Sequence, residues 1–168
     1  MASITLGGTP THTIGELPSV GSKAPDFNLK AVDLSTKSLS DFTNSVLILN
    51  IFPSVDTGVC ATSVRNFNKT AAQLEHTKVV CISRDLPFAQ ARFCGAEDLD
   101  NVINLSDYKN GSFGKDYGLD FVDGPLETLH SRVVVVIDEN GTVKHTEQVA
   151  EIVDEPNYKA ALEALLDD

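Results

Sequence analysis

Three cysteines are the residues of this chain best suited to nucleophilic or redox chemistry. They are Cys60, Cys81 and Cys94, an odd number in a chain of 168 residues. A chain of that length can bury a core without covalent cross-links, so a secreted framework of disulfides is not expected. One or two of these thiols are therefore candidates for catalysis.

Cys60 lies where an apolar stripe with helical spacing begins. From Gly58 onwards, apolar residues recur at steps of three and four, which predicts a helix with Cys60 in its first turn. The unpaired N–H groups and positive dipole of a helix N-terminus favour the thiolate, the nucleophilic form of cysteine. The alternative is that Cys60 is only a small core residue on this stripe.

The segment before Cys60 has the composition of a tight turn between a strand and a helix. Pro53 ends an apolar run, and Thr57 stands just before the predicted helix. Such a turn suits an exposed nucleophile at the junction of the two elements. Taken singly, Pro53 is more simply explained as a strand terminator and Thr57 as a helix N-cap.

The other two cysteines have different settings. Cys94 follows a predicted short helix over residues 87–93 and precedes Gly95, where that helix would stop and could unwind easily. The alternative is that Cys94 is only a small buried core residue that packs beside Phe93. Cys81 lies within the apolar strand 78–83, where burial would keep its thiol protonated and inert, and we assign it no catalytic role.

The elements that position these residues follow from hydrophobic periodicity. The predicted strands are residues 46–52, 78–83, 101–105, 132–138 and 142–149, and the predicted helices begin at residue 58, cover residues 87–93 and follow Pro156. The alternation of strands and helices at residues 46–105 predicts parallel pairing. Asn140-Gly141 would supply the positive φ angles of a tight hairpin turn.

The order of these elements favours one α/β domain over residues 1–168. It suits a thioredoxin-like, glutaredoxin-type α/β sandwich. A short β-hairpin turning at Gly7-Gly8 is expected within residues 1–15, as an appendage on the core. No internal repeat or interdomain linker interrupts the chain.

Composition excludes several classes of partner. The 13 basic and 24 acidic residues give a net charge of −11, which repels phosphate backbones and anionic lipid surfaces. No membrane-length apolar run or leader pattern is present, so a cytoplasmic protein is expected. The four histidines are expected on the surface, and they lack ligand spacing, so no metal or cofactor is predicted. They are His12, His76, His130 and His145.

The residues around two of the cysteines resemble those of a known enzyme family. Pro53, Thr57 and Cys60 match the peroxiredoxin signature Pro-x-x-x-Thr-x-x-Cys at every defined position. The Arg-Phe-Cys-Gly stretch at residues 92–95 is similar to the second cysteine motif of the bacterial thiol peroxidase subfamily, which is of the atypical two-cysteine type. The resemblance covers nearly the whole chain.

This resemblance implies a role for each matching residue. Cys60 would attack a hydroperoxide and become a sulfenic acid, and Cys94 would then form an intramolecular disulfide with it. Thr57 would hydrogen-bond the peroxide, and Pro53 would shield it from water. Arg132, which precedes the strand at residues 133–137, matches the family's active-site arginine and would stabilise charge, although it could be only a surface residue flanking that strand.

The same resemblance implies the reaction partners. Thioredoxin would be the reductant, the enzyme would be a homodimer, and organic hydroperoxides would be preferred over hydrogen peroxide. Because both cysteines are predicted in or beside helices, and a disulfide needs Cα atoms within about 7 Å, the second step would require local unwinding.

Three other functions compete with peroxide reduction. A general disulfide oxidoreductase would carry Cys-x-x-Cys, but Ser63 stands where the second sulfur would be. A redox sensor would use the same sulfur chemistry and differ in kinetics. A cysteine hydrolase needs a histidine base, and His130, the one candidate, has no Asp or Asn orienter recognisable in the sequence.

Overall fold

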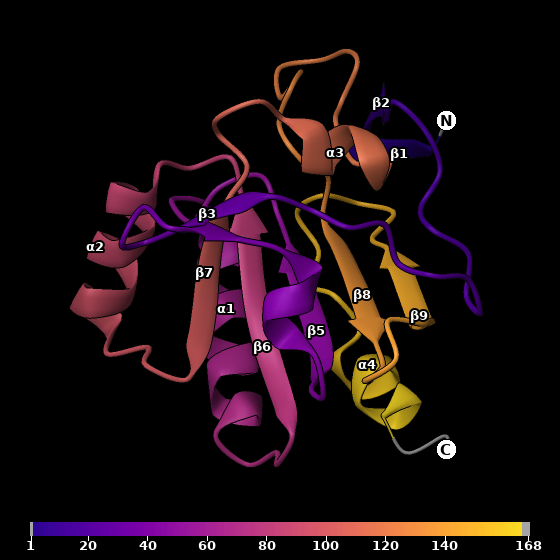
Figure 1. The fold of residues 1–168 in the computed structure, drawn as a ribbon. Coiled ribbons are helices and arrows are strands. Elements are labelled where there is room, and N and C mark those ends of the chain that lie inside the picture. The colour runs from indigo at the N-terminus through magenta and orange to yellow at the C-terminus, as the bar shows by residue number, and fades with distance from the viewer. Residues whose placement is uncertain (1, 166–168) are drawn as a thin grey trace.

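The computed structural model describes residues 2–165 and is built on a seven-stranded sheet, most of whose strands are labelled in Figure 1. The strand order is β4-β3-β7-β6-β5-β8-β9. Their bounds are β3 Leu29–Ala31, β4 Thr36–Lys37, β5 Val46–Ile51, β6 Thr77–Ser83, β7 Val102–Ser106, β8 Val133–Ile137 and β9 Val143–Gln148. Strands β5, β6 and β7 are parallel, as predicted, whereas β8 pairs antiparallel with β5.

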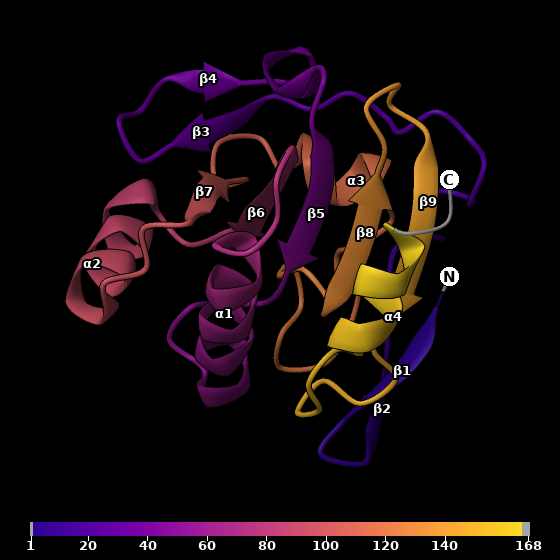
Figure 2. The same cartoon turned by 90° about the horizontal axis from the view of Figure 1, so that it is seen from below.

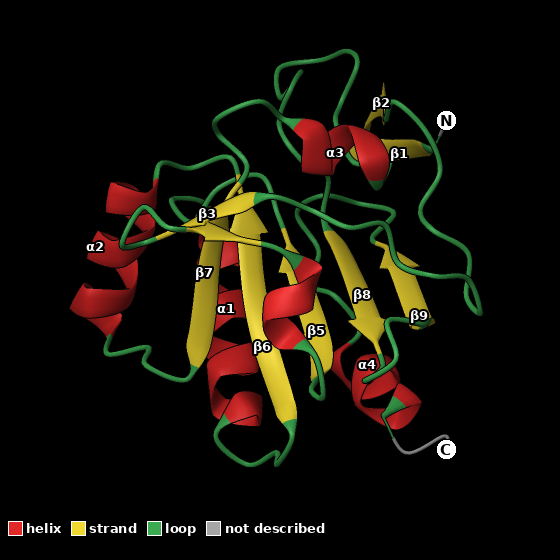
Figure 3. Cartoon of the chain, viewed as in Figure 1, coloured by secondary structure: helices red, strands yellow, loops and turns green. Residues whose placement is uncertain are grey.

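Helices lie on both faces of this sheet (Figures 2 and 3). Their bounds are η1 Leu39–Phe42, α1 Gly58–Ala71, α2 Pro87–Glu97, α3 Ser112–Asp116 and α4 Tyr158–Ala164. Helix α1 connects β5 to β6 and α2 connects β6 to β7, so both are crossovers between parallel strands. Figure 2 shows α1 and α4 on the same face of the sheet.

Two hydrophobic cores, one on each face, follow from the alternation of side chains along the strands. Leu49, Ile51, Val133 and Val135 belong to a core that also contains Phe113 of α3, which we call the α3-face core. Side chains at the alternate positions of these strands point to the other face and belong to a second core. It packs against α1, and we call it the α1-face core. Its members include Ile48, Phe52, Cys60, Val64, Val134 and Val136. Burial on both faces explains the nearly continuous apolar runs of β5 and β8.

The predicted N-terminal hairpin is present and forms its own two-stranded sheet, β1 Ser3–Leu6 and β2 Thr9–His12. Gly7 and Gly8 have φ angles of 57° and 87°, the left-handed values that a two-residue turn requires. The Glu151 carboxylate accepts hydrogen bonds from both of their N–H groups, at 3.1 and 2.8 Å. The hairpin is thus tied to the segment that precedes α4.

The long elements agree with the predictions to within one or two residues, with one clear difference at α2. That helix does not stop at Gly95 but continues to Glu97. It ends where Asp98 adopts the left-handed conformation, φ 53°, and its N–H bonds to the Cys94 carbonyl. Glycine is tolerated inside the helix, and the C-cap conformation falls on Asp98 instead.

The turn between β8 and β9 also differs from the prediction. Gly141 has a positive φ of 80°, but Asn140 does not. The Asp138 carboxylate organises this turn by accepting hydrogen bonds from the N–H groups of Asn140 and Thr142, both at 2.9 Å. Strands β3 and β4 and helices η1 and α3, which are all short, were not predicted. Among residues 2–165, no helix combines the length and apolar character needed to cross a membrane.

Candidate active site

The turn from β5 into α1 places Pro53 and Thr57. Pro53 is buried directly after the last residues of β5, whereas Thr57 is exposed. Thr57 is the N-cap residue of α1, but its side chain makes no capping hydrogen bond. Its hydroxyl donates instead to the carbonyl of Ser54, at 3.2 Å. The alternative role of Thr57 as an N-cap therefore holds for its backbone and not for its side chain.

Cys60 lies in the first turn of α1, as the sequence predicted. The first N–H groups of an α-helix have no partner within the helix, and the Thr57 side chain does not occupy them. They remain available to an anion at the Cys60 sulfur. The expectation of an exposed nucleophile was wrong, however: Cys60 is 0% exposed and packs within the α1-face core.

Arg132 is brought to this site by the pairing of β5 with β8. Ile51 lies opposite Val133 in the antiparallel pairing. Arg132, one residue before Val133, therefore lies beside the end of β5 from which the Pro53 turn departs. By alternation, Arg132 points to the same face as Val134, the face of the α1-face core. Tyr158, a partly buried member of that core, supports this placement of Arg132. Burial raises the pKa of Tyr158 to about 12, and the charge of Arg132 opposes that rise.

Arg132 is not the surface residue that one reading of the sequence allowed. It is 2% exposed, and its Nε donates to the carbonyl of Ile152 at 2.8 Å. Its Nη1 is buried and has no hydrogen-bond partner among residues 2–165. Burying a guanidinium N–H without a hydrogen-bond acceptor costs free energy. An anionic sulfur or a peroxide oxygen would be a suitable acceptor for this donor.

Cys94 lies inside the last turns of α2 and is half-buried. The Asn104 side chain donates to its sulfur, Nδ2 to Sγ 2.9 Å. Burial raises the pKa of the Cys94 thiol, and the bond from Asn104 opposes that rise. An open surface groove runs beside it, lined by Ala91, Gly95, Leu99 and Val102 among others. All three cysteines are free thiols in this structure.

Cys81 is buried in β6, as predicted. It has no exposed surface, and burial raises the pKa of its thiol to about 12. Its sulfur accepts a weak hydrogen bond from the Asn50 side chain at 3.7 Å. A thiol with this environment stays protonated at physiological pH, which fits a core role.

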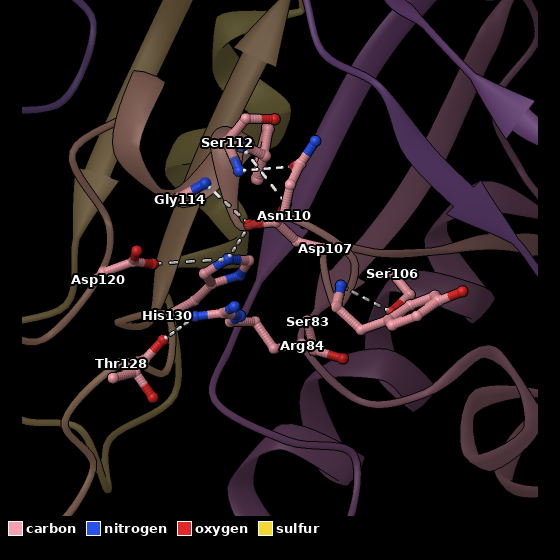
Figure 4. A network of polar contacts seen from close by, with 12 residues as sticks. Ser83, Arg84, Ser106, Asp107, Asn110, Ser112, Gly114, Asp120, Thr128 and His130 are labelled. Carbon is pink, nitrogen blue, oxygen red and sulfur yellow. Dashed lines mark hydrogen bonds and ion pairs between the residues drawn. The ribbon is translucent and has the colours of Figure 1, made fainter.

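His130 is the clearest departure from the sequence-based expectations (Figure 4). It is fully buried rather than on the surface, and its Nε2 lies 2.9 Å from Asp107 Oδ2 and 3.8 Å from Asp120 Oδ1. Burial raises the pKa of Asp120, and the charge of His130 opposes this. The sequence near His130 has no recognisable acidic side chain to orient its ring, but Asp107, in the turn after β7, supplies one.

His130 is not placed to act as a base for Cys60. The His130 ring packs against Phe113, with ring centroids 5.8 Å apart, and Phe113 belongs to the α3-face core. Cys60 belongs to the α1-face core, on the other side of the sheet. The arrangement removes the geometric basis for a cysteine hydrolase. Within residues 2–165, no group of three or more His, Cys, Asp or Glu residues could hold a metal ion.

One site residue, Asp85, escaped the sequence analysis. Its carboxylate accepts hydrogen bonds from the Ser54 hydroxyl at 2.7 Å and from the Val55 N–H at 2.9 Å. Both donors lie in the turn that leads to Cys60. The signal in the sequence was a carboxylate two residues after a buried parallel strand, at the carboxyl end of the strand, where sites in such sheets gather.

Comparison with known proteins identifies the family. A model of the Redoxin family matches residues 19–162. Thiol peroxidases from Mycobacterium bovis and Mycobacterium tuberculosis are each 54% identical over 165 residues, which cover 98% of this chain and 99% of theirs.

Solved structures agree with this assignment. A peroxiredoxin-like protein from Aquifex aeolicus superposes with a TM-score of 0.92 at 33% identity, covering 99% of this chain and 97% of that one. A thiol peroxidase from Chromobacterium violaceum, 23% identical, has the same fold with a TM-score of 0.91 over 98% of this chain and 95% of its own. The chain therefore belongs to the Redoxin family, within which it falls among the thiol peroxidases, peroxiredoxin-type enzymes that reduce peroxides with electrons from thiols.

Proposed function

We propose that Cys60 is the sulfur that meets the peroxide and that Cys94 captures the product. The Cys60 thiolate attacks one oxygen of a hydroperoxide, the O–O bond breaks, and the departing alkoxide takes a proton to become an alcohol. The sulfur keeps the other oxygen as a sulfenic acid. The observation that carries this assignment is the placement of Cys60 in the first turn of α1, on the face of the sheet to which the unsatisfied Arg132 Nη1 belongs.

Arg132 and Thr57 stabilise the charge that develops along the breaking O–O bond. The free Nη1 of Arg132 is a preorganised, buried donor. The Thr57 hydroxyl lies at the N-cap of the same helix and gives up its bond to the Ser54 carbonyl to reach the peroxide. Pro53, buried behind this turn, keeps water from the sulfur.

The second step joins the two cysteines of one chain. The Cys94 sulfur attacks the sulfenic sulfur of Cys60, a disulfide forms, and the sulfenic oxygen leaves as water. Two thiol groups of the reductant then regenerate both cysteines and become a disulfide themselves. We assign thioredoxin as this reductant and the cytoplasm as the place of reaction, because that compartment keeps thiols reduced. The open groove beside Cys94 favours attack by the reductant on that sulfur.

Organic hydroperoxides are the proposed preferred substrates, with hydrogen peroxide also accepted, and the working form is a homodimer. Leu86 and Phe88, 50% and 65% exposed at the start of α2, give apolar surface near the Pro53 turn that suits an alkyl group or a second subunit. Light scattering on the purified protein tests the dimer.

A coupled assay tests the function. NADPH consumption is followed with thioredoxin reductase, thioredoxin and cumene hydroperoxide, with hydrogen peroxide as the comparison substrate. Turnover that is lost in Cys60→Ser and retained in Cys81→Ser supports the assignment. An active Cys60→Ser enzyme would refute it, and turnover with another thiol donor but not with thioredoxin would refute the assigned reductant alone.

A further inference from the structure

A single carboxylate, that of Asp85, joins the segments that lead into the helices of Cys60 and Cys94. Asp85 lies between the end of β6 and the start of α2. Its Oδ1 accepts the Ser54 hydroxyl at 2.7 Å, and its Oδ2 accepts the Val55 N–H at 2.9 Å. Because α2 begins at Pro87, the same short stretch that carries this carboxylate also starts the helix of Cys94.

Asp85 is itself held firmly from the sheet side. Ser83, buried at the end of β6, donates its hydroxyl to Asp85 Oδ2 at 2.6 Å. The buried amide of Gln90 donates to the Ser83 hydroxyl at 3.2 Å and to the Leu105 carbonyl at 2.9 Å. The Ser106 hydroxyl donates to the Asp85 carbonyl. The carboxylate is therefore a fixed point to which the neighbouring turn attaches.

Through Ser54, this attachment extends to the first turn of α1. The Ser54 carbonyl accepts the N–H of Thr57 at 3.3 Å and its hydroxyl at 3.2 Å. The Thr57 carbonyl in turn accepts the N–H of Ala61 at 3.0 Å, the bond that closes the first helical turn around Cys60. Release of Ser54 and Val55 from Asp85 would therefore loosen the segment that buries the Cys60 sulfur.

We propose that Asp85 is a positioning residue that sets the balance between the two steps of catalysis, an inference that rests on the proposed function. With its bonds to Ser54 and Val55 intact, the turn and both helices are folded, which is the arrangement for reducing peroxide. Formation of the disulfide requires the Cα atoms of Cys60 and Cys94 to come within about 7 Å, which calls for local unwinding of α1, α2 or both. Asp85 opposes that unwinding at one place for both cysteines.

Other contacts between these segments are weaker or lie elsewhere. Arg92 of α2 approaches Asp56 of the turn only to 3.5 Å, and both side chains are about two-thirds exposed. Arg65 and Glu97 form an ion pair at 2.6 Å, but it joins the middle of α1 to the far end of α2. The Asp85 contacts, by contrast, reach the turn before Cys60 from a carboxylate that the buried Ser83 holds in place.

The test measures the two steps separately in Asp85→Ala. Peroxide reduction is measured in a Cys94→Ser background, by quenched flow and mass spectrometry of the Cys60 sulfenic acid. Disulfide formation is measured with Cys94 present, at saturating peroxide. Loss of hydrogen bonds to a charged group is expected to slow the first step about tenfold while the second is unchanged or faster.

Two further variants make the result specific. Ser54→Ala removes one donor to the carboxylate and should shift the ratio of the two rates in the same direction by a smaller factor. It serves as the test if Asp85→Ala does not fold. Asp138→Ala is the matched control, because it removes a carboxylate that accepts two N–H bonds in the β8–β9 turn, at the other end of the sheet. It should leave the ratio unchanged.

The outcomes separate this proposal from the proposed function. If Asp85→Ala and Ser54→Ala slow both steps equally, leave both unchanged, or slow only disulfide formation, Asp85 does not set the balance. If the unmodified Cys60 forms no sulfenic acid in the Cys94→Ser background, the proposed function fails first, whatever the effect of Asp85.

Discussion

Ile51 and Val133 lie opposite each other in the antiparallel pairing of β5 with β8. This pairing determines the site, because one strand leads into the turn and helix of Cys60 and the other begins just after Arg132. Residues that are far apart in the sequence are thus brought to the same end of these two strands.

Thr57→Val and Arg132→Met are expected to slow peroxide reduction by more than ionisation can explain. Converting an ordinary thiol entirely to thiolate at pH 7 gains only about thirtyfold. Loss of a preorganised donor to developing oxygen charge typically costs about 10²-fold or more. Single-turnover rates with cumene hydroperoxide, set beside the thiolate fraction from ultraviolet absorbance, make the comparison. Equal losses in both quantities would contradict a role at the O–O bond.

Asn104→Ala is expected to raise the pKa of Cys94 further. The lost bond, Nδ2 to Sγ, is the contact that opposes the effect of burial on this thiol. A thiol attacks as the thiolate, so the pH at which disulfide formation reaches half its maximum rate should move upward. The pH profile of that step checks this, with peroxide reduction by Cys60 as the internal control. An unchanged profile would mean that Asn104 does not influence the thiol.

His130→Ala is expected to destabilise the fold without abolishing catalysis. Removing one partner of a buried hydrogen bond costs about 1–3 kcal/mol, and the fully buried His130 has its Nε2 2.9 Å from Asp107 Oδ2. Because its ring packs in the α3-face core, the rate per folded molecule should stay within about threefold of the original. Urea unfolding and single-turnover kinetics measure the two quantities. A stable but inactive variant would revive the histidine as a catalytic base.

Alkaline pH is expected to reduce the stability of the protein. Burial raises the pKa of Cys81 from 9.0 to about 12 and that of Tyr158 from 10.0 to about 12. These groups stay neutral in the fold but ionise in the unfolded chain, so their contribution is complete below about pH 9 and is lost as pH rises toward 12. The urea midpoint should fall between about pH 8 and pH 10.5. A smaller fall in Cys81→Ser would assign part of it to that thiol, and an unchanged midpoint would contradict the burial argument.

The sequence was sufficient for features that depend on local pattern. The step of apolar residues after Gly58 predicted α1 and the place of Cys60 in it, and the apolar runs predicted β5, β6 and β8. Gly7 and Gly8 predicted their turn because both positions need left-handed backbone.

Features that depend on distant partners could not be predicted in this way. The burial of His130 depends on Asp107, which comes from a separate turn, and the role of Asp85 depends on donors some thirty residues earlier. The burial of Cys60 depends on packing between α1 and the sheet. Sequence periodicity identifies which face of an element is apolar, but not how completely another element covers it.

The most direct test of the central claim is the fate of the Cys60 sulfur in Cys94→Ser after exposure to one equivalent of cumene hydroperoxide. Dimedone trapping and peptide mass spectrometry should find the sulfenic acid on Cys60 in nearly every molecule, with Cys81 unmodified. The variant should complete this first turnover and then stop with thioredoxin as the reductant. A sulfenic acid on Cys81, or none on Cys60, would contradict the account.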